Sequence, residues 1–506
     1  MLKLPRSLSR LSLILCIPLI LTACYEPIAF NDPIVEEAPD IGSPFIGGTT
    51  IPLVDFGYEE KEYFYSGEAH SYTSATPLQS HGMWHVTPAD SANYKSRMLV
   101  YRPTDPTAFN GTVVVEWLNV TAGIDAGADW VFLHTELLRK GYAWVGISAQ
   151  ALGIEGGDAI FPLPLPVSMA LKDRGPERYA SLSHPGDSFS YDIFAQAVQA
   201  IRHPQGVAPL EGLQIQRVLA TGDSQSASRL ITFIDAFGTR TDLFDGYMVH
   251  SRLGDIPEAE DSIAPLSQAP QTEVPVPDDA IVRRDLFKPV MNVQTETDLF
   301  LAGALGSRQN DNHFYRLWEV AGSSHADLYS FILGQNDRGD NPIAAMVAIT
   351  NSLHPFFTPC SEPVNTAPQH HFVLKAALHA LNEWVANGTA PASVPRLTLN
   401  SHGDGFEYDE FGNVLGGLRT PYVNVPIATF SGENMSSREE EGICFLVGTT
   451  EMLDEATLQS LYPDHDSYVT AVADSTAEAV AQGFLLQEDA ELIIEAAHVS
   501  YILLFP

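Results

Sequence analysis

Apolar and polar residues alternate along the chain in two kinds of pattern. Short apolar runs such as 111–120, GTVVVEWLNV, predict strands with both faces buried. Between these runs, apolar residues recur every three or four positions, as Trp130, Leu133 and Leu137 do, which predicts amphipathic helices. Strands are predicted over 97–103, 111–120, 143–150, 217–222, 245–252, 289–298 and, with its following loop, 316–327; helices are predicted over 128–142, 187–202, 226–238, 370–388 and 475–498.

The regular alternation predicts an α/β fold with a doubly wound, mainly parallel sheet. Two long segments, 151–186 and 253–283, interrupt it, and each follows a predicted strand. Open α/β sheets bind ligands beyond the carboxyl ends of their strands. These segments are therefore candidate lids, and surface loops without a functional role are the alternative. The pattern changes towards the C-terminus, which predicts a partly helical extension, 396–506, packed on a body formed by 51–395.

The N-terminus has the pattern of an export signal. Three basic residues precede the apolar run LSLILCIPLILTA, which is shorter than the roughly 18 residues that a membrane span needs. Residues 1–23 are therefore predicted to be a signal peptide. The following segment, 24–50, is rich in Pro, Gly and acidic residues without periodicity, which predicts a flexible tether.

The end of the signal, LTAC, resembles the lipobox of bacterial lipoproteins. This resemblance implies that Cys24 is lipidated and becomes the mature N-terminus, a stable anchor when more than one acyl chain is attached. Tyr25 in place of an aspartate implies sorting to the outer membrane. The predicted location is therefore the bacterial cell envelope, with the lipid as the membrane contact; ordinary secretion is the alternative.

The cysteine content indicates the compartment of the protein, and the net charge argues against one class of partner. If Cys16 leaves with the signal and Cys24 carries lipid, Cys360 and Cys444 remain as a pair in an oxidising compartment, and a disulfide is predicted between them. The 63 acidic residues outnumber the 27 basic ones and give a net charge of −36. This charge argues against nucleic acid as a partner. The oligomeric state cannot be inferred from the sequence.

A candidate nucleophile lies at a strand-to-helix turn in LATGDSQSASRL, residues 219–230. Ser224 is flanked two positions away by Gly222 and Ser226, small residues that such a sharp turn requires. A serine in such a turn presents its hydroxyl above the sheet, next to a helix N-terminus. By itself, the motif fits a plain helix N-cap equally well.

The order of later polar residues favours the nucleophile. In this topology the acid and the histidine of a serine hydrolase follow at later strand ends. The strand over 289–298 ends in TETD, which offers Glu296 and Asp298, and the next strand is followed by GSSHAD, which offers His325. The three side-chain types therefore occur in the order Ser, acid, His that acyl transfer needs.

These motifs, together with WLNV, ALNEWVANGTAP and DEFGNVLGGLRTPYVNVP, resemble the α/β-hydrolase superfamily, and within it a bacterial family of α/β hydrolase domain proteins with a long C-terminal extension. The resemblance covers most of the mature chain and implies the hydrolase fold and an esterase-like activity. It favours Asp298 over Glu296, because the acid generally lies several residues beyond its strand. Ser226 departs from the superfamily's glycine and matches the narrower family.

The predicted function is cofactor-independent hydrolysis of a small acyl ester by Ser224, His325 and Asp298 through an acyl-enzyme. Main-chain N–H groups of Gln225 and of Asn119 or Val120 are the candidates for binding the oxyanion. An amide or thioester hydrolase with the same residues is one alternative, and a catalytically inactive envelope binding protein is another.

The other polar clusters in the sequence do not indicate a functional site. His81 and His85 are four residues apart, yet no third ligand accompanies them, so no metal site is predicted. His370, His371 and His379 are interpreted as the solvated or packing face of their helix.

Overall fold

The computed structural model describes residues 26–159, 168–254, 262–348, 360–435 and 443–504. The predicted signal peptide and Cys24 lie outside the described residues, as do parts of both candidate lids. Among the described helices, none combines the length and the apolar character that crossing a membrane would take.

A ten-stranded sheet forms the centre of the described chain, in the order β10-β9-β8-β7-β4-β5-β3-β2-β1-β6. The six strands from β10 to β5 are mutually parallel, whereas β3, β2 and β1 pair antiparallel. The strands are β1 (Ile34–Glu37), β2 (Tyr58–Thr73), β3 (Thr87–Pro103), β4 (Thr112–Trp117), β5 (Ala143–Ile147), β6 (Gln205–Gly206), β7 (Arg217–Asp223), β8 (Gly246–His250), β9 (Val290–Thr295) and β10 (Tyr315–Val320).

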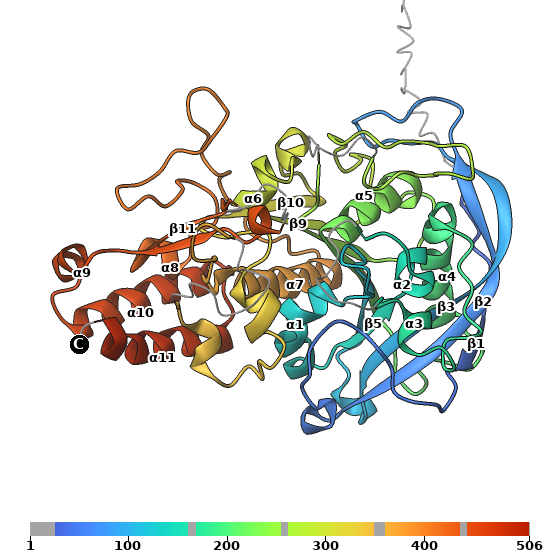
Figure 1. Ribbon diagram of the computed structural model, residues 1–506, viewed down its shortest axis with the longest axis horizontal. Helices are drawn as coiled ribbons and strands as arrows, with labels where there is room; N and C mark the ends of the chain where they lie inside the picture. Colours follow the sequence, from blue (N-terminus) through green and yellow to red (C-terminus); the bar gives the residue numbers. More distant parts are fainter. Residues whose placement is uncertain (1–25, 160–167, 255–261, 349–359, 436–442, 505–506) are drawn as a thin grey trace, which may run out of the picture.

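Helices cover both faces of this sheet (Figure 1). In β4, Val113 and Val115 pack with α4 and α5 on one face, while Val114 packs with α1 and α7 on the other. This alternation confirms the doubly wound, mainly parallel fold. The helices are α1 (Ala128–Arg139), α2 (Ala151–Glu155), α3 (Leu171–Arg174), α4 (Ser190–Arg202), α5 (Gln225–Phe237), α6 (Glu296–Phe300), α7 (Gln369–Asn387), α8 (Pro421–Asn424), α9 (Glu455–Leu461), α10 (His465–Ala481) and α11 (Gln487–Leu504).

The segment predicted to be a tether is partly structured. Strand β1 pairs with β2 and β6, and Phe30 and Val35 are buried in the core. The prediction of a flexible tether over 24–50 was therefore wrong for this part of the segment. Its short strand is stabilised by partners that are distant in sequence, which local composition does not reveal.

The C-terminal helices α9, α10 and α11 gather at one end of the molecule, coloured red in Figure 1. Their apolar residues share a core cluster with α1 and α7. At the start of α11, the buried Asp489 accepts hydrogen bonds from Arg139 of α1, at 2.8 and 3.0 Å, and from Lys375 of α7, at 3.0 Å. Burial opposes ionisation of this carboxyl, but the two cations hold the pKa of Asp489 below its usual range.

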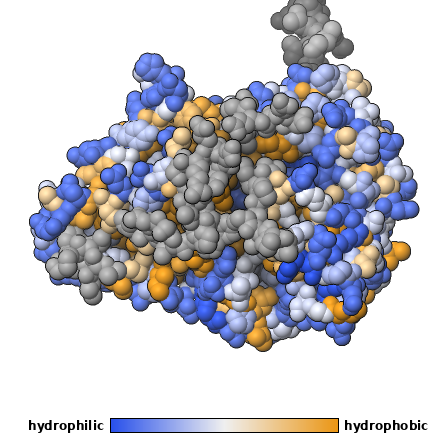
Figure 2. Space-filling model, in the orientation of Figure 1, coloured by the Kyte–Doolittle hydropathy of each residue, from blue (hydrophilic) through white to orange (hydrophobic). Residues whose placement is uncertain are grey.

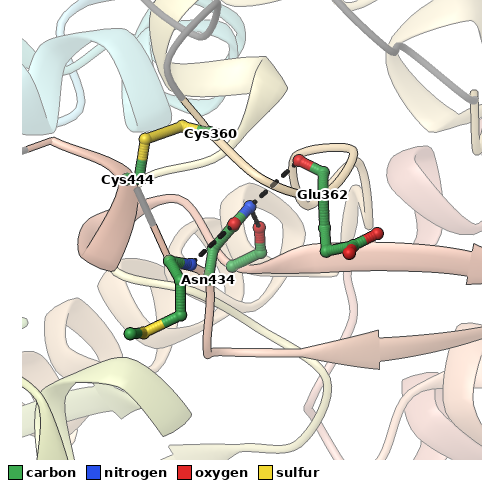
Figure 3. Close-up of a disulfide and its surroundings, with 6 residues drawn as sticks. Cys360, Glu362, Asn434 and Cys444 are labelled. Atoms are coloured by element: carbon green, nitrogen blue, oxygen red, sulfur yellow. Dashed lines mark hydrogen bonds between the residues drawn. A yellow bond between two sulfur atoms is a disulfide. The ribbon is translucent and has the colours of Figure 1, made fainter. Parts of the chain in front are cut away.

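A disulfide joins Cys360 to Cys444, as predicted, across 84 positions of sequence. It lies beside the two-stranded sheet of β11 (Ala428–Ser431) and β12 (Thr449–Met452). Nearby, the Asn434 side chain donates to the Glu362 carbonyl at 3.2 Å and to the Gly448 carbonyl at 2.7 Å (Figure 3). The covalent bond and these hydrogen bonds hold neighbouring loops together.

The described surface is mostly hydrophilic on the face shown in Figure 2, with hydrophobic residues in small groups between polar ones. Large exposed apolar side chains, such as Val54, Phe287 and Met435, are far apart in the sequence. Single exposed apolar residues of this kind are ordinary for a folded protein.

Candidate active site

Ser224 lies between β7 and α5 in a strained main-chain conformation. Its φ of 60° and ψ of −124° lie in a region that residues with a side chain rarely adopt. The turn brings strand and helix together so closely that a Cβ on Gly222 would lie 2.9 Å from the Ser226 carbonyl oxygen. Glycine is therefore required at 222, and the turn presents the Ser224 hydroxyl at the carboxyl end of the sheet.

Ser226 occupies the position where the superfamily pattern has glycine, and its side chain stabilises the turn. Its hydroxyl donates to the Asp223 carbonyl at 2.7 Å and accepts the Asp223 N–H at 3.1 Å. Serine is therefore tolerated at position 226, because its side chain is small and forms its hydrogen bonds within the turn.

The structure brings Ser224, His325 and Asp298 together. The Ser224 hydroxyl lies 2.9 Å from His325 Nε2, and His325 Nδ1 lies 2.6 Å from Asp298 Oδ1. The His325 main chain is held as well, since its N–H donates to Thr297 Oγ1 at 3.1 Å. All three side chains are largely buried. The order of strand ends predicted this constellation.

Asp298 also forms part of the N-terminal cap of α6. Its Oδ2 accepts the Thr295 N–H at 2.6 Å, which leaves Oδ1 directed at His325. Burial disfavours the charged carboxylate, but the His325 charge and these hydrogen bonds outweigh it and lower the pKa of Asp298. Asp298 is therefore a carboxylate whose Oδ1 can accept a hydrogen bond from His325 Nδ1.

Glu296, the alternative acid, points elsewhere. Its carboxyl accepts the Gly322 N–H at 2.5 Å and the Gly432 N–H at 2.9 Å. Burial raises the pKa of Glu296 to about 8, although the two N–H groups act against the shift. Glu296 thus links the start of α6 to the loop after β10 and to the end of β11.

The candidate oxyanion donors differ in whether their main-chain N–H groups already donate a hydrogen bond within the protein. Gln225 is the first residue of α5, so no carbonyl of its own helix accepts its N–H. The Asn119 N–H already donates to the Ala126 carbonyl at 2.9 Å, so it was wrongly predicted as a main-chain donor. The Asn119 side chain instead donates to the Asp223 carbonyl at 3.0 Å and ties its loop to the Ser224 turn. For the Val120 N–H, the described residues supply no hydrogen-bond acceptor.

Sequence reasoning missed a buried group of polar side chains beneath this turn. His250 and His370 lie with their Nε2 atoms 2.9 Å apart, and neither side chain is exposed. The sequence indicates only a solvated or packing face for His370, and in the structure this residue is packed and fully buried. The sequence did contain an indication of this group. His250 is the last residue of β8, the neighbour of β7, and the polar residues of a site gather at the carboxyl ends of such strands.

Over the described ranges, no group of three or more His, Cys, Asp or Glu side chains is arranged to hold a metal ion.

A family model described as alpha/beta hydrolase domain matches residues 27–495. The chain belongs to this alpha/beta hydrolase family. No curated protein matches it. Among solved structures, acetyl xylan esterase 1 from Thermoanaerobacterium sp. is 9% identical, over 57% of this hydrolase and 81% of that chain, with a TM-score of 0.29. A thermostable esterase from Pseudomonas putida is 10% identical, over 51% of this hydrolase and 69% of that chain, with a TM-score of 0.27.

Proposed function

We propose that this hydrolase cleaves carboxylic esters of small molecules, with Ser224 as nucleophile, His325 as general base and Asp298 as the acid that orients it. The observation that carries the proposal is the unbroken chain of contacts from the Ser224 hydroxyl through His325 to Asp298, at 2.9 and 2.6 Å. In this arrangement Asp298 fixes a proton on Nδ1 and leaves Nε2 free to accept the serine proton.

The reaction proceeds in two steps. Ser224 Oγ attacks the ester carbonyl carbon while its proton passes to His325 Nε2, and the same proton then leaves with the alcohol. Water then attacks the acyl carbonyl carbon while His325 Nε2 takes its proton, and this proton passes to Ser224 Oγ as the bond to the acyl group breaks and the acid leaves. The oxyanion of each tetrahedral intermediate accepts hydrogen bonds from the N–H groups of Gln225 and Val120. One such donor contributes about 10²–10³-fold to kcat in serine hydrolases.

The test is covalent labelling with a fluorophosphonate probe. The wild-type protein is expected to be labelled, whereas Ser224→Ala is not. Ser460→Ala removes an exposed hydroxyl of α9 and is expected to be labelled like the wild type. Equal labelling of wild type and Ser224→Ala refutes the proposal. Turnover of p-nitrophenyl esters but not of the matching anilides or thioesters is the expected specificity, and the reverse preference would identify an amide or thioester hydrolase.

We also propose that the protein is anchored in the bacterial cell envelope by lipid on Cys24. The disulfide between Cys360 and Cys444 supports an oxidising compartment. Radiolabelled palmitate is expected to label the wild type in a bacterial host and not Cys24→Ala. An unlabelled wild type would refute the anchor and leave secretion as the explanation of the export signal.

A further inference from the structure

A segment near the C-terminus, residues 418–435 and 443–448 (the C-terminal segment), holds the loop that carries His325. Directly after β10, the Ala321 N–H donates to the Leu418 carbonyl at 3.0 Å. Directly after the base, the Ala326 N–H donates to the Leu446 carbonyl at 2.9 Å. The C-terminal segment therefore binds the main chain of this loop on both sides of His325.

One hydroxyl group connects the C-terminal segment directly to His325. Thr297, in the first turn of α6, is fully buried. Its Oγ1 lies 2.5 Å from the Gly432 carbonyl oxygen and 3.1 Å from the His325 main-chain nitrogen. The carbonyl can only accept and the N–H can only donate, so the hydroxyl donates its hydrogen to Gly432 and accepts the hydrogen of His325. Thr297 thus forms a bridge in which both hydrogen bonds have a defined direction.

Glycine is needed at position 432 because the chain approaches α6 closely there. Gly432 follows β11, which ends beside α6 (Figure 1). A Cβ on Gly432 would lie 2.5 Å from the Glu296 Cβ and 2.5 Å from the Thr297 main-chain nitrogen. The Gly432 N–H also donates to Glu296 Oε2 at 2.9 Å. The first turn of α6 therefore fixes the position of Gly432 and of the carbonyl that accepts the Thr297 hydrogen bond.

Asn365 joins the same two parts of the chain without using Thr297. Its Nδ2 donates to the Gly322 carbonyl at 3.1 Å, in the loop that carries His325, and to the Ser431 carbonyl at 3.2 Å. Ser431 is the last residue of β11. The end of β11 is thus attached to this loop by a second, independent side chain, so we expect the segment to stay docked when the Thr297 hydroxyl is removed.

The position of His325 determines the reaction rate because its ring must reach Ser224 and Asp298 at the same time. Its Nε2 lies 2.9 Å from the Ser224 hydroxyl, and its Nδ1 lies 2.6 Å from Asp298 Oδ1. Asp298 directly follows Thr297, so one turn of α6 holds the base by its ring and by its main chain. Without the Thr297 oxygen, the His325 N–H loses its acceptor and the loop can move away from Ser224. A misplacement of about 1 Å between reacting groups can cost about 10²-fold in rate.

We propose that Thr297 is a positioning residue that fixes the main chain of His325 to Gly432, so that the C-terminal segment sets the position of the base. This inference rests on the proposed function of Ser224 and His325. Both the attack of Ser224 and the hydrolysis of the acyl-enzyme use His325, so both steps depend on this contact. Because Thr297 acts only through His325, its loss lowers kcat and leaves KM nearly unchanged.

Three substitutions test this contact. Thr297→Val preserves the shape of the side chain and removes the hydroxyl, whereas Thr297→Ser retains the hydroxyl. Gly432→Ala leaves Thr297 intact and displaces the carbonyl, because the new Cβ has no room beside α6. The matched control is Thr476→Val. Thr476 is a fully buried threonine of α10, and its hydroxyl donates to the Val472 carbonyl of the same helix at 2.6 Å.

The experiment measures kcat and KM for p-nitrophenyl acetate, with urea unfolding to confirm that each variant is folded. We expect kcat to fall about 10- to 100-fold in Thr297→Val, with KM within about twofold of the wild type, and to stay within about threefold in Thr297→Ser. Gly432→Ala is expected to lower kcat as well. The double variant should be no slower than the slower single variant, because both changes remove the same contact. Thr476→Val is expected to match the wild type in kcat.

A proton NMR signal tests the coupling without any turnover. The His325 Nδ1–H that bonds to Asp298 gives a downfield signal, which is identified by its absence in His325→Gln. We expect this signal to shift in Thr297→Val and to keep its wild-type position in Thr297→Ser and Thr476→Val.

Wild-type kcat in a folded Thr297→Val overturns the inference, as does a Thr297→Ser that is no faster than Thr297→Val. An equal loss in Thr476→Val, or losses that multiply in the double variant, overturn it too. If Thr297→Val does not fold, Gly432→Ala decides, and wild-type kcat in that variant refutes the coupling. If the wild type neither reacts with the fluorophosphonate probe nor hydrolyses esters, the proposed function fails, and an unchanged NMR signal in Thr297→Val still refutes the coupling separately.

Discussion

Amide substitutions at Asp298 and Glu296 separate the roles of two carboxyl groups that are two residues apart. In Asp298→Asn, the amide oxygen can still accept the Thr295 N–H, so the cap of α6 persists. The amide NH₂ then faces His325 Nδ1, and His325 must carry its hydrogen on Nε2. This tautomer cannot accept the proton of Ser224, so the base is lost while the geometry remains.

The expected magnitudes differ strongly between the two variants. The equivalent acid-to-amide change in a serine protease lowers kcat about 10⁴-fold, which is about 5 kcal/mol of transition-state stabilisation. Glu296→Gln leaves one of two buried N–H groups, those of Gly322 and Gly432, without an acceptor. This costs about 1–3 kcal/mol of stability, and kcat is expected to stay within about threefold of the wild type because Glu296 does not contact His325.

The assay is kcat/KM with p-nitrophenyl acetate, combined with urea unfolding to confirm that each variant is folded at the assay temperature. The pair of variants serves as its own matched control, since each replaces one carboxylate by its amide within α6. Near-normal kcat in Asp298→Asn, or a collapse in a folded Glu296→Gln, would show that the His325–Asp298 contact is not the one used in catalysis.

Three further predictions concern stability. Asp489→Asn leaves the buried Lys375 without a carboxylate partner and the partly exposed Arg139 with Glu136 alone, and it is expected to cost about 3 kcal/mol in urea unfolding. The exposed ion pair of Glu488 is worth under about 1 kcal/mol, so an equally small effect at Asp489 would refute its role in docking α11. Replacing Cys360 and Cys444 by serine removes a cross-link over 84 positions and is expected to lower the free energy of unfolding by about 2–4 kcal/mol, an effect that reduction of the wild type should reproduce. The pKa of Glu296 is raised to about 8, so the folded state binds this proton more tightly than the unfolded state. Stability that is present below about pH 4.5 is therefore lost as the pH rises through 8. The stability of the wild type relative to Glu296→Gln should fall over this range, and a constant difference would contradict the shift.

The sequence predicted the sheet and the three strand ends of the site because these depend on local patterns. A parallel strand buried on both faces is a continuous apolar run, and the residue after it lies at the binding edge. The choice between Glu296 and Asp298 depended on where α6 begins. Residues two apart on a helix point about 200° apart, so once the helix starts at Glu296 only one of the pair can face His325.

Local sequence patterns do not predict contacts between segments that are far apart in the sequence. Strand β1 has four residues and is held by β2 and β6, so its composition alone resembled a linker. The Asn119 N–H donates to the carbonyl of Ala126, seven residues away, and is therefore not available to an oxyanion. This contact lies in an irregular loop, which no sequence periodicity predicts. His370 lies in the first turn of the long helix α7, and its burial depends on α1 and β8 packing over that end.

The position of β8 explains why its last residue matters to the site. Strand order places β8 between β7, which leads into Ser224, and β9, which leads into α6 and Asp298. The end of β8 therefore lies near both Ser224 and Asp298, and the His250 side chain there is fully buried. His250 uses its carbonyl to hold the strained Ser224 turn and its ring to reach Asp129 and His370. A hydrophobic residue there could keep the carbonyl contact but would leave Oδ1 of the buried Asp129 without its His250 partner. The side chain at the end of β8 is thus determined by the carboxylates around it as well as by the turn that it supports.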